Sequence, residues 1–222
     1  MRKILMLSVV AALAIVGCKK QEATISRVVT VSYPTITIKG QQFYSFPVGG
    51  GPMPSVNSIQ ATAYDSFYRQ SITPVIDASH LSNVLPGLYI ATVSARNSYG
   101  FTGYAYVYVA ITNINDSMNL AGKYVRIANN DTVNISRLAR GLYKSDNVAG
   151  VLNTPSLRQF IIPGYFVQTT DTTLDMPLQP SVQGSFEGGS GAISLSPGDT
   201  TIQYAILNNG NYGTSVRTFK KI

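Results

Sequence analysis

The pattern that decides the fold is Leu85-Pro86-Gly87-Leu88-Tyr89-Ile90-Ala91-Thr92-Val93-Ser94-Ala95-Arg96-Asn97-Ser98-Tyr99-Gly100, followed by Tyr104-Ala105-Tyr106-Val107-Tyr108-Val109. Side chains alternate in character along both halves, which is the periodicity of β-strands. The Asn-Ser-Tyr-Gly turn between them can reverse the chain, because Gly100 adopts a positive φ without steric cost. The stretch therefore predicts a β-hairpin, with the tyrosines of 104–108 on one sheet face and the smaller residues of 105–109 on the other.

The hairpin also resembles the last hairpin of bacterial immunoglobulin-like and hyalin-repeat domains. The shared features are Pro-Gly-x-Tyr at 86–89, the alternating strand, and Asn-x-x-Gly at 97–100. The resemblance covers about residues 30–112 and implies a small immunoglobulin-like β-sandwich of two packed sheets. Domains of this kind usually act as spacers or binding modules, and no catalytic residue comes with the resemblance.

The surrounding sequence is typical of β structure throughout. Thr, Val, Ile and Tyr are abundant, the chain has Gly 19 and Pro 11, and no window beyond the first eighteen residues has a convincing helical period. Upstream of the hairpin we predict strands at 27–31, 35–40, 56–64 and 70–76. The loop 47–54 between them is glycine- and proline-rich, and no Lys-Ser/Thr follows its glycines, which favours a turn over a phosphate-binding loop.

A polar break at 112–117 is the preferred domain boundary. Beyond it, short strand patterns separated by turn residues predict a second antiparallel β-sandwich or a partly closed β-barrel. The expected strands are 123–127, 132–136, 141–144, 159–168, 173–176, 182–186, 192–195, 203–207 and 215–220, with Gly188-Gly189-Ser190-Gly191 as one of the turns. The predicted organisation is all-β: a signal peptide (1–17), a tether (18–32), an immunoglobulin-like sandwich (33–113) and a C-terminal β domain (114–222).

The first eighteen residues predict secretion. Arg2 and Lys3 precede an apolar run, 4–16, that is too short to span a bilayer as a stable helix. The end of the run, Ile15-Val16-Gly17-Cys18, resembles the bacterial lipobox, which implies cleavage before Cys18 and a diacylglycerol on its sulfur. The alternative is a chance cysteine in an ordinary signal peptide, but Cys18 is the only cysteine in the chain. The resemblance thus makes Cys18 a lipid anchor and the membrane a partner.

The residues after the cysteine bear on location. In enterobacterial lipoproteins, an aspartate directly after the lipidated cysteine is the inner-membrane retention signal. This chain has Lys19 at that position and does not resemble the signal, so we expect the outer membrane. Lys19-Lys20-Gln21-Glu22 has one acid, unlike the acidic export cluster of gut-type Bacteroidota lipoproteins, which leaves the periplasmic and surface sides both open. The two-part plan, with Gly141–Asn147 and Arg217–Lys221, resembles Bacteroidota lipoproteins of unknown function, some of which accompany glycan-uptake systems.

Charge weighs against a nucleic-acid partner. The chain has a formal net charge of +7, and removing Arg2 and Lys3 with the signal peptide lowers it to +5. The basic residues are scattered and form no stripe with interleaved aromatic residues, whereas nucleic-acid binding requires a concentrated basic surface.

Few residues suit catalysis or metal binding. His80 is the only histidine, and Asp77-Ala78-Ser79-His80 is better explained as a polar loop than as a triad, whose members converge from separate elements. Asn129-Asn130-Asp131 and Asp146-Asn147 have the composition of calcium loops without the spacing, so turns explain them better. We expect no metal and no cofactor.

A hydrolase using Asp171, Asp175 or Glu187 is the enzymatic alternative, which would require two carboxylates facing each other across a cleft.

Aromatic side chains are the best functional candidates. The chain has Tyr 14, Phe 8 and Trp 0, and exposed rings can stack on sugar faces. The candidates form two groups: Tyr99, Phe101 and Tyr104 around the hairpin turn, and Tyr64, Phe67 and Tyr68 around a second loop. We predict a non-enzymatic, lipid-anchored envelope protein that binds a glycan or outer-membrane transport proteins. The alternative is a purely structural spacer, in which the tyrosines cover a sheet face and bind no ligand.

Overall fold

The computed structural model describes residues 31–55, 57–196 and 198–222. The predicted signal peptide, Cys18 and most of the strand predicted at 27–31 lie outside these residues. The described chain is all-β, with one short 3-10 helix, η1 (Arg158–Phe160), and no α-helix. None of its helices is long and apolar enough to cross a membrane. Residues Ser32–Ile222 form one compact unit.

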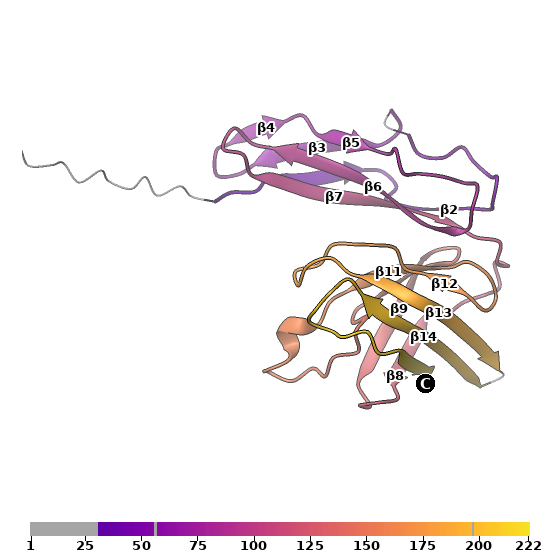
Figure 1. Cartoon of the computed structure of the whole chain (residues 1–222). Coiled ribbons are helices and arrows are strands. Elements are labelled where there is room, and N and C mark those ends of the chain that lie inside the picture. Colours follow the sequence, from indigo (N-terminus) through magenta and orange to yellow (C-terminus); the bar gives the residue numbers. More distant parts are fainter. Residues whose placement is uncertain (1–30, 56, 197) are drawn as a thin grey trace, which may run out of the picture. The chain divides into compact units, whose positions relative to one another are not determined.

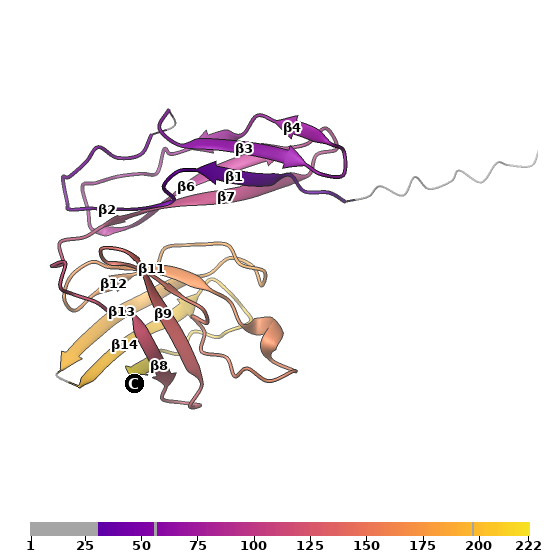
Figure 2. The same ribbon diagram turned by 180° about the vertical axis from the view of Figure 1, so that it is seen from behind.

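The first half of the described chain forms a sandwich of two sheets (Figures 1 and 2). Its strands are β1 (Thr35–Lys39), β2 (Phe43–Phe46), β3 (Gln60–Asp65), β4 (Gln70–Ile72), β5 (Val75–Asp77), β6 (Gly87–Arg96) and β7 (Thr102–Ile111). One sheet has the order β1-β3-β4 and the other β2-β7-β6-β5. All pairs are antiparallel except β2 with β7, which is parallel.

The core between the two sheets follows from strand alternation. Ala91, Val93 and Val107 are buried inside the sandwich, and Ile36 and Ile38 of the other sheet pack against them. The side chains between these positions on β6 and β7 point to the outer face of the sheet, because successive residues of a strand point to opposite faces. The predicted hairpin is present: β6 and β7 pair from Arg96 with Thr102 to Gly87 with Ile111. Gly100 in its turn has φ 90°, which favours glycine.

The strand predictions for this half differ from the structure at three points, of which the first is the strand expected at 56–64, which begins only at Gln60, in β3. The single strand expected at 70–76 is two strands, β4 and β5, which belong to different sheets. Pro74 separates them, and proline cannot donate a backbone hydrogen bond to a neighbouring strand. The strand β2 has no counterpart among the predictions, because all four of its side chains are half-buried and no alternation marks it.

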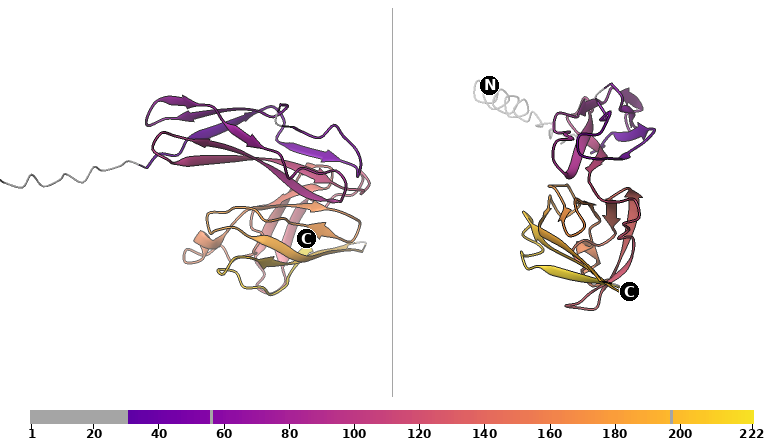
Figure 3. Two further views of the ribbon diagram at one scale, coloured as in Figure 1. Left: turned by 45° about the horizontal axis from the view of Figure 1, so that its top comes forward. Right: turned by 90° about the vertical axis from the view of Figure 1, so that its right-hand side faces the viewer.

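The second half forms one eight-stranded antiparallel sheet that curls around its own core (Figure 3). The strands are β8 (Gly122–Arg126), β9 (Thr132–Ala139), β10 (Leu142–Ser145), β11 (Gly164–Gln168), β12 (Leu174–Asp175), β13 (Glu187–Ser196), β14 (Asp199–Leu207) and β15 (Arg217–Lys221). Their order is β12-β11-β10-β9-β8-β15-β14-β13. Tyr124, Tyr143, Phe166, Tyr204 and Phe219 are fully buried in the core.

The two edges of this sheet meet at β12 and β13. Thr173 and Ala192 form an antiparallel bridge, and the backbone N–H of Ile193 donates to the carbonyl of Thr172 at 2.8 Å. The N–H of Gly188 donates to the carbonyl of Met176 at 2.8 Å. The sheet is therefore a nearly closed barrel, the second of the two architectures that the sequence predicts for the C-terminal half.

Three predictions for the second half require correction. The strand expected at 159–168 is shorter, because η1 occupies its start and β11 begins at Gly164. Residues 182–186 form no strand and contribute a single bridge, between Gln179 and Phe186. The turn expected at Gly188-Gly189-Ser190-Gly191 lies inside β13, where the register shifts between Gly189 and Ala192.

Side chains of the two halves are in contact. Tyr108 of β7 stacks on Tyr165 of β11, with ring centroids 4.1 Å apart. The N–H of Leu88 donates to Asp175 Oδ2 at 2.8 Å. Sheet membership changes between β7 and β8, in the region of the predicted boundary at 113/114, and the division into two domains stays a prediction.

Candidate functional site

Two loops and the beginning of the described chain meet at one end of the sandwich. Asp65, at the end of β3, accepts hydrogen bonds on Oδ1 from the Ser32 hydroxyl at 2.8 Å and from the N–H groups of Phe67 and Tyr68, both at 3.1 Å. Its other oxygen, Oδ2, accepts a hydrogen bond from Asn97 Nδ2 at 2.7 Å. Asp65 therefore joins three segments that are distant in sequence.

Asn97 extends this network into the hairpin turn. Its Nδ2 also donates to the carbonyl of Ser32 at 2.9 Å, while its Oδ1 accepts from the N–H groups of Tyr99 at 3.1 Å and Phe101 at 3.0 Å. Asp65 and Asn97 are both buried. We name these two residues and Ser32 the tip network; it fixes the backbone from which several aromatic side chains project.

Hydrogen bonding also sets the charge state of the network. Burial alone would raise the pKa of the Asp65 carboxyl, but hydrogen bonds from Asn97, Ser32 and the two backbone N–H groups hold that pKa below its ordinary value. The carboxylate is therefore the stable form at neutral pH.

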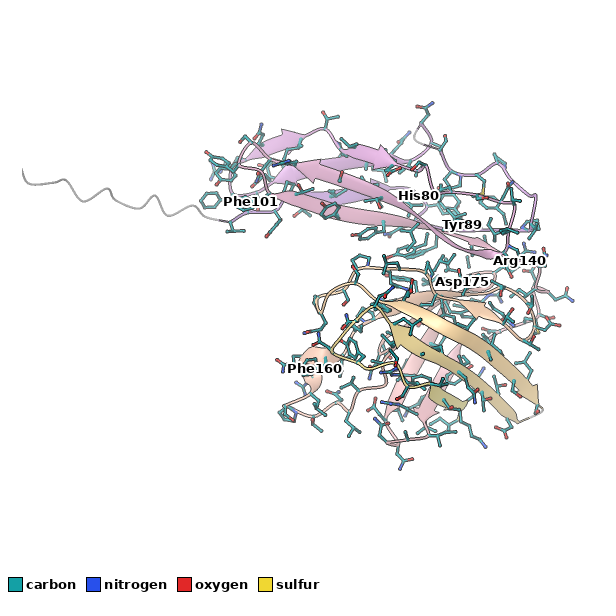
Figure 4. The ribbon with its side chains drawn as sticks, viewed as in Figure 1. His80, Tyr89, Phe101, Arg140, Phe160 and Asp175 are labelled. Carbon is teal, nitrogen blue, oxygen red and sulfur yellow. The ribbon has the colours of Figure 1, made fainter. Side chains whose placement is uncertain are left out.

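Five aromatic residues surround the tip network, and we name them the aromatic tip: Tyr33, Phe67, Tyr68, Tyr99 and Phe101. The Tyr68 and Tyr99 rings stack with centroids 4.1 Å apart at 16°. Phe67 meets Tyr68 edge-on at 4.9 Å, and Tyr33 meets Phe101 edge-on at 5.6 Å. Phe101 is labelled in Figure 4, at the end of the sandwich where the described chain begins.

A second aromatic feature lies on the outward face of β7. Tyr104 and Tyr106 line an open groove of about 580 Å³, and we name this groove the tyrosine groove. Its remaining walls are Tyr33, Pro34, Thr35, Thr102, Gly103, Pro180, Ser181 and Val182. Tyr104 is 59% exposed, whereas Tyr108 on the same face is buried against Tyr165. Burial and the neighbouring Tyr104 both raise the pKa of Tyr106, so its hydroxyl stays protonated.

The structure divides the sequence-predicted ligand residues among three places. Tyr68, Tyr99 and Phe101 belong to the aromatic tip, where the two predicted loops meet. Tyr104 belongs to the tyrosine groove. Tyr64 lies on β3 with an exposed side chain, next to the buried Ala63, and so faces outward from the other sheet of the sandwich.

Sequence reasoning missed Tyr33, which contributes to both features. The Tyr33-Pro34 pair marks the start of β1 in the sequence and gives no sign of a surface role. A Cβ added at Gly103 would lie 2.0 Å from the Pro34 carbonyl oxygen. Glycine at 103 therefore permits the close approach of the segment that places Tyr33 beside Phe101.

The candidate carboxylates of a hydrolase have structural partners or lie on the surface. Asp175 accepts the Leu88 N–H described above, and burial raises the pKa of its carboxyl against the opposing effect of hydrogen bonds from Leu88 and Met176. Glu187 Oε1 accepts a hydrogen bond from Asn208 Nδ2 at 2.7 Å, and Asp171 is exposed in a turn. None of the three lines the tyrosine groove. Figure 4 shows Asp175 on the side of the barrel that faces Tyr89.

The remaining polar candidates form turns. Asp77 Oδ1 accepts hydrogen bonds from the Ser79 hydroxyl at 2.6 Å and the Ser79 N–H at 3.0 Å, so this serine does not pair with a histidine. His80 lines a hollow of about 240 Å³ with mainly apolar neighbours.

The two loops whose composition resembles a calcium site, 129–131 and 146–147, also use their aspartate side chains in hydrogen bonds within the protein. Asp131 Oδ2 accepts from Asn147 Nδ2 at 3.0 Å, and Asp146 accepts from the N–H and side-chain amide of Asn134 at 2.8 and 2.7 Å. Within 31–222, apart from residues 56 and 197, no group of three or more His, Cys, Asp or Glu could hold a metal ion.

No family model matches the chain, and no curated protein matches it. Among solved structures, the chain is similar to the crystal structure of the lipoprotein BT2262 from Bacteroides thetaiotaomicron. The TM-score is 0.38 and the identity 16%, over 85% of this chain and 100% of that chain. At this TM-score the likeness carries no inference about fold or function.

The fold defines an all-β protein with two exposed aromatic features, the aromatic tip and the tyrosine groove. The sandwich presents rings at one end and on one outer face, and of the three candidate carboxylates Asp175 and Glu187 accept hydrogen bonds while Asp171 is exposed.

Proposed function

We propose that the protein is a non-enzymatic envelope lipoprotein, anchored through Cys18 at the outer membrane, that binds a glycan in the tyrosine groove as an accessory of an uptake system. The observation that carries this proposal is the groove itself, an open hollow of about 580 Å³ lined by the exposed rings of Tyr33 and Tyr104 and the half-buried ring of Tyr106. Open, aromatic-lined surfaces suit extended ligands better than small molecules, which prefer enclosed pockets.

The groove offers both kinds of contact that a sugar needs. The rings of Tyr33, Tyr104 and Tyr106 provide apolar faces, and phenol hydroxyls provide hydrogen bonds. Thr35 and Thr102 lie along the same walls, and their hydroxyl groups add further polar partners. The walls of the groove come from residues 33–35, from β7 and from residues 180–182, so the groove depends on the folded arrangement of distant segments.

The state of the acidic residues supports binding over turnover. Glycoside hydrolysis requires two carboxyl groups flanking one bond at about 5–10 Å from each other. Asp175 is bound to the Leu88 N–H and Glu187 to Asn208, while Asp171 is exposed in a turn.

The test is retention of the mature chain, beginning at Cys18, in native gels that contain a panel of polysaccharides. We expect retardation by at least one polysaccharide, and a loss of affinity of roughly tenfold, about 1.4 kcal/mol, for Tyr104→Ala. The control is Tyr64→Ala, which removes an equally large exposed ring from the other sheet and should leave retention unchanged.

Two results would refute the groove as the glycan site. One is normal migration in every polysaccharide gel. The other is an equal loss for Tyr64→Ala and Tyr104→Ala, which would indicate a general effect of removing surface tyrosines.

A further inference from the structure

The aromatic tip exposes large rings on a rigid support. Tyr33 is 62%, Phe67 57% and Tyr99 57% exposed, although the backbone of all three segments is tied to the tip network. Leaving a contiguous patch of aromatic side chains exposed to water is unfavourable, and such a patch usually marks a contact surface. The tip therefore has the properties of a surface that is covered in its working state.

Basic side chains flank these rings. Arg69 and Arg96 are both exposed. The Arg96 guanidinium lies over the hairpin turn, since a Cβ added at Gly100 would be 3.2 Å from it. Asp65, the acid of these two loops, is buried and fully engaged in hydrogen bonds. The accessible charge at the tip is thus positive.

The tip is also the point at which the anchored end of the chain joins the sandwich. Ser32 is part of the tip network through its hydroxyl and its carbonyl. Residues 19–31 connect it to Cys18 and can reach at most roughly 50 Å when fully extended. They contain Lys19, Lys20 and Arg27 against Glu22, a net charge of +2 that complements anionic lipid headgroups.

We propose that the aromatic tip docks on the headgroup layer of the membrane that holds the anchor, a role that rests on the proposed lipid at Cys18 and goes beyond glycan binding. Tyrosine and other amphipathic rings prefer the interface between water and hydrocarbon. Arginine side chains beside them attract anionic phospholipids. An acyl anchor and a second interfacial contact together hold a protein more firmly than either alone.

A glycan is a poorer match for the tip than for the tyrosine groove. Tyr68 and Tyr99 stack face to face at 4.1 Å, so each ring already uses one of the faces that a sugar would need. Phe67 and Phe101 have no hydroxyl to offer a sugar, but a lipid interface accepts them readily.

Site-specific fluorescence tests this proposal, because the chain contains no tryptophan. Tyr99→Trp places a single reporter at the tip, and Ile127→Trp places the control on an exposed turn of the barrel half. The chain from Cys18 onward would be coupled through that thiol to a maleimide lipid in phosphatidylethanolamine and phosphatidylglycerol vesicles carrying brominated acyl chains. We expect bromine quenching at least twofold stronger for Tyr99→Trp than for Ile127→Trp.

A second reporter covers the case in which Tyr99→Trp disturbs the stack with Tyr68. Phe67→Trp should be quenched like Tyr99→Trp, and replacing phosphatidylglycerol by phosphatidylcholine should weaken the quenching of both. The proposal is overturned if both tip reporters are quenched no more than the Ile127→Trp control. Chemical coupling makes this outcome independent of lipidation in the cell, so a missing anchor and a missing tip contact give different results.

Discussion

At the scale of single residues, Asp65 fixes the surface on which the membrane proposal depends. Its two oxygens receive hydrogen bonds from Ser32, Asn97 and two backbone N–H groups. An asparagine at this position has only one acceptor oxygen. Its NH₂ group would face either the Asn97 NH₂ group or the backbone N–H groups of Phe67 and Tyr68, and the hydrogen bonds on that side would be lost. We expect Asp65→Asn to lower the melting temperature and to loosen both loops of the tip.

The pH dependence of this effect has a definite sign. Hydrogen bonds hold the pKa of Asp65 below its ordinary value, so its stabilisation is present above about pH 4 and is lost as pH falls through the lowered pKa. Urea unfolding of the wild type and Asp65→Asn should therefore differ most near neutral pH and converge in acid. Asp171→Asn, an exposed aspartate in a turn, is the control. A difference that stays constant from pH 7 to pH 3 would contradict this role for the carboxylate.

At this scale, the exposure of some aromatic side chains could be predicted from the sequence, but the contacts between them could not. Tyr68 and Tyr99 could be predicted as surface candidates because each lies beside turn residues. Their stacking, and the contribution of Tyr33, could not be predicted, because Asp65 joins Ser32 and Asn97 across more than thirty residues in each direction. Local patterns contain no information about hydrogen bonds of that separation.

At the scale of elements, a glycine-rich strand allows the barrel to close. Added Cβ atoms at Gly188 and Gly189 would lie 2.7 Å from Met176 Cβ and 2.5 Å from Leu207 Cδ1. One at Gly191 would lie 2.4 Å from Leu174 Cδ1 and 2.6 Å from the Leu174 carbonyl oxygen. Without side chains here, β12 can approach β13 closely enough for the two edges to hydrogen-bond.

We expect Gly191→Ala to destabilise the protein by about 1–3 kcal/mol, the usual cost of forcing an extra group into a packed contact. Gly210→Ala is the matched control, because nothing lies within 4 Å of its added Cβ, and it should change stability by less than about 0.5 kcal/mol. Chemical denaturation of the two variants measures both values. Equal stability of the two would mean that the contact of β12 with β13 tolerates a side chain at position 191.

The same glycines explain an error of prediction at this scale. A run of glycines in a sequence is typical of both a turn and a strand that another backbone approaches closely. The sequence offers no means of choosing, because the approaching residue, Leu174, lies on another strand. The β6–β7 hairpin could be predicted well, because side chains alternate in character along both its strands and turn residues lie between them.

At the scale of the whole molecule, contacts between β7 and β11 couple the sandwich to the barrel. Leu88, Tyr108 and Ala110 of the sandwich share a buried cluster with Leu142 and Val167 of the barrel. The tyrosine stripe of β7 could be predicted as one sheet face, but not its division into a buried end at Tyr108 and an open end at Tyr104. That division depends on where the barrel covers the sheet.

We expect Tyr108→Ala to weaken this coupling and to cost about 3–5 kcal/mol, as truncation of a buried aromatic side chain does. Calorimetry should then resolve two unfolding transitions in place of one. Tyr64→Ala, which removes a ring that is 46% exposed, should leave the transition unchanged. A single cooperative transition at the wild-type temperature for Tyr108→Ala would show that the cluster contributes little to coupling.

Both functional proposals place the protein at a membrane through a lipid on the Cys18 sulfur. The most direct test is mass spectrometry of the amino-terminal peptide from the membrane fraction, with Cys18→Ser produced in parallel. We expect the wild-type peptide to begin at Cys18 and to carry the mass of a diacylglycerol, and Cys18→Ser to keep residues 1–17 without a lipid. Recovery of Cys18→Ser in the membrane fraction, with the same processing as the wild type and no lipid mass on either, would contradict the account.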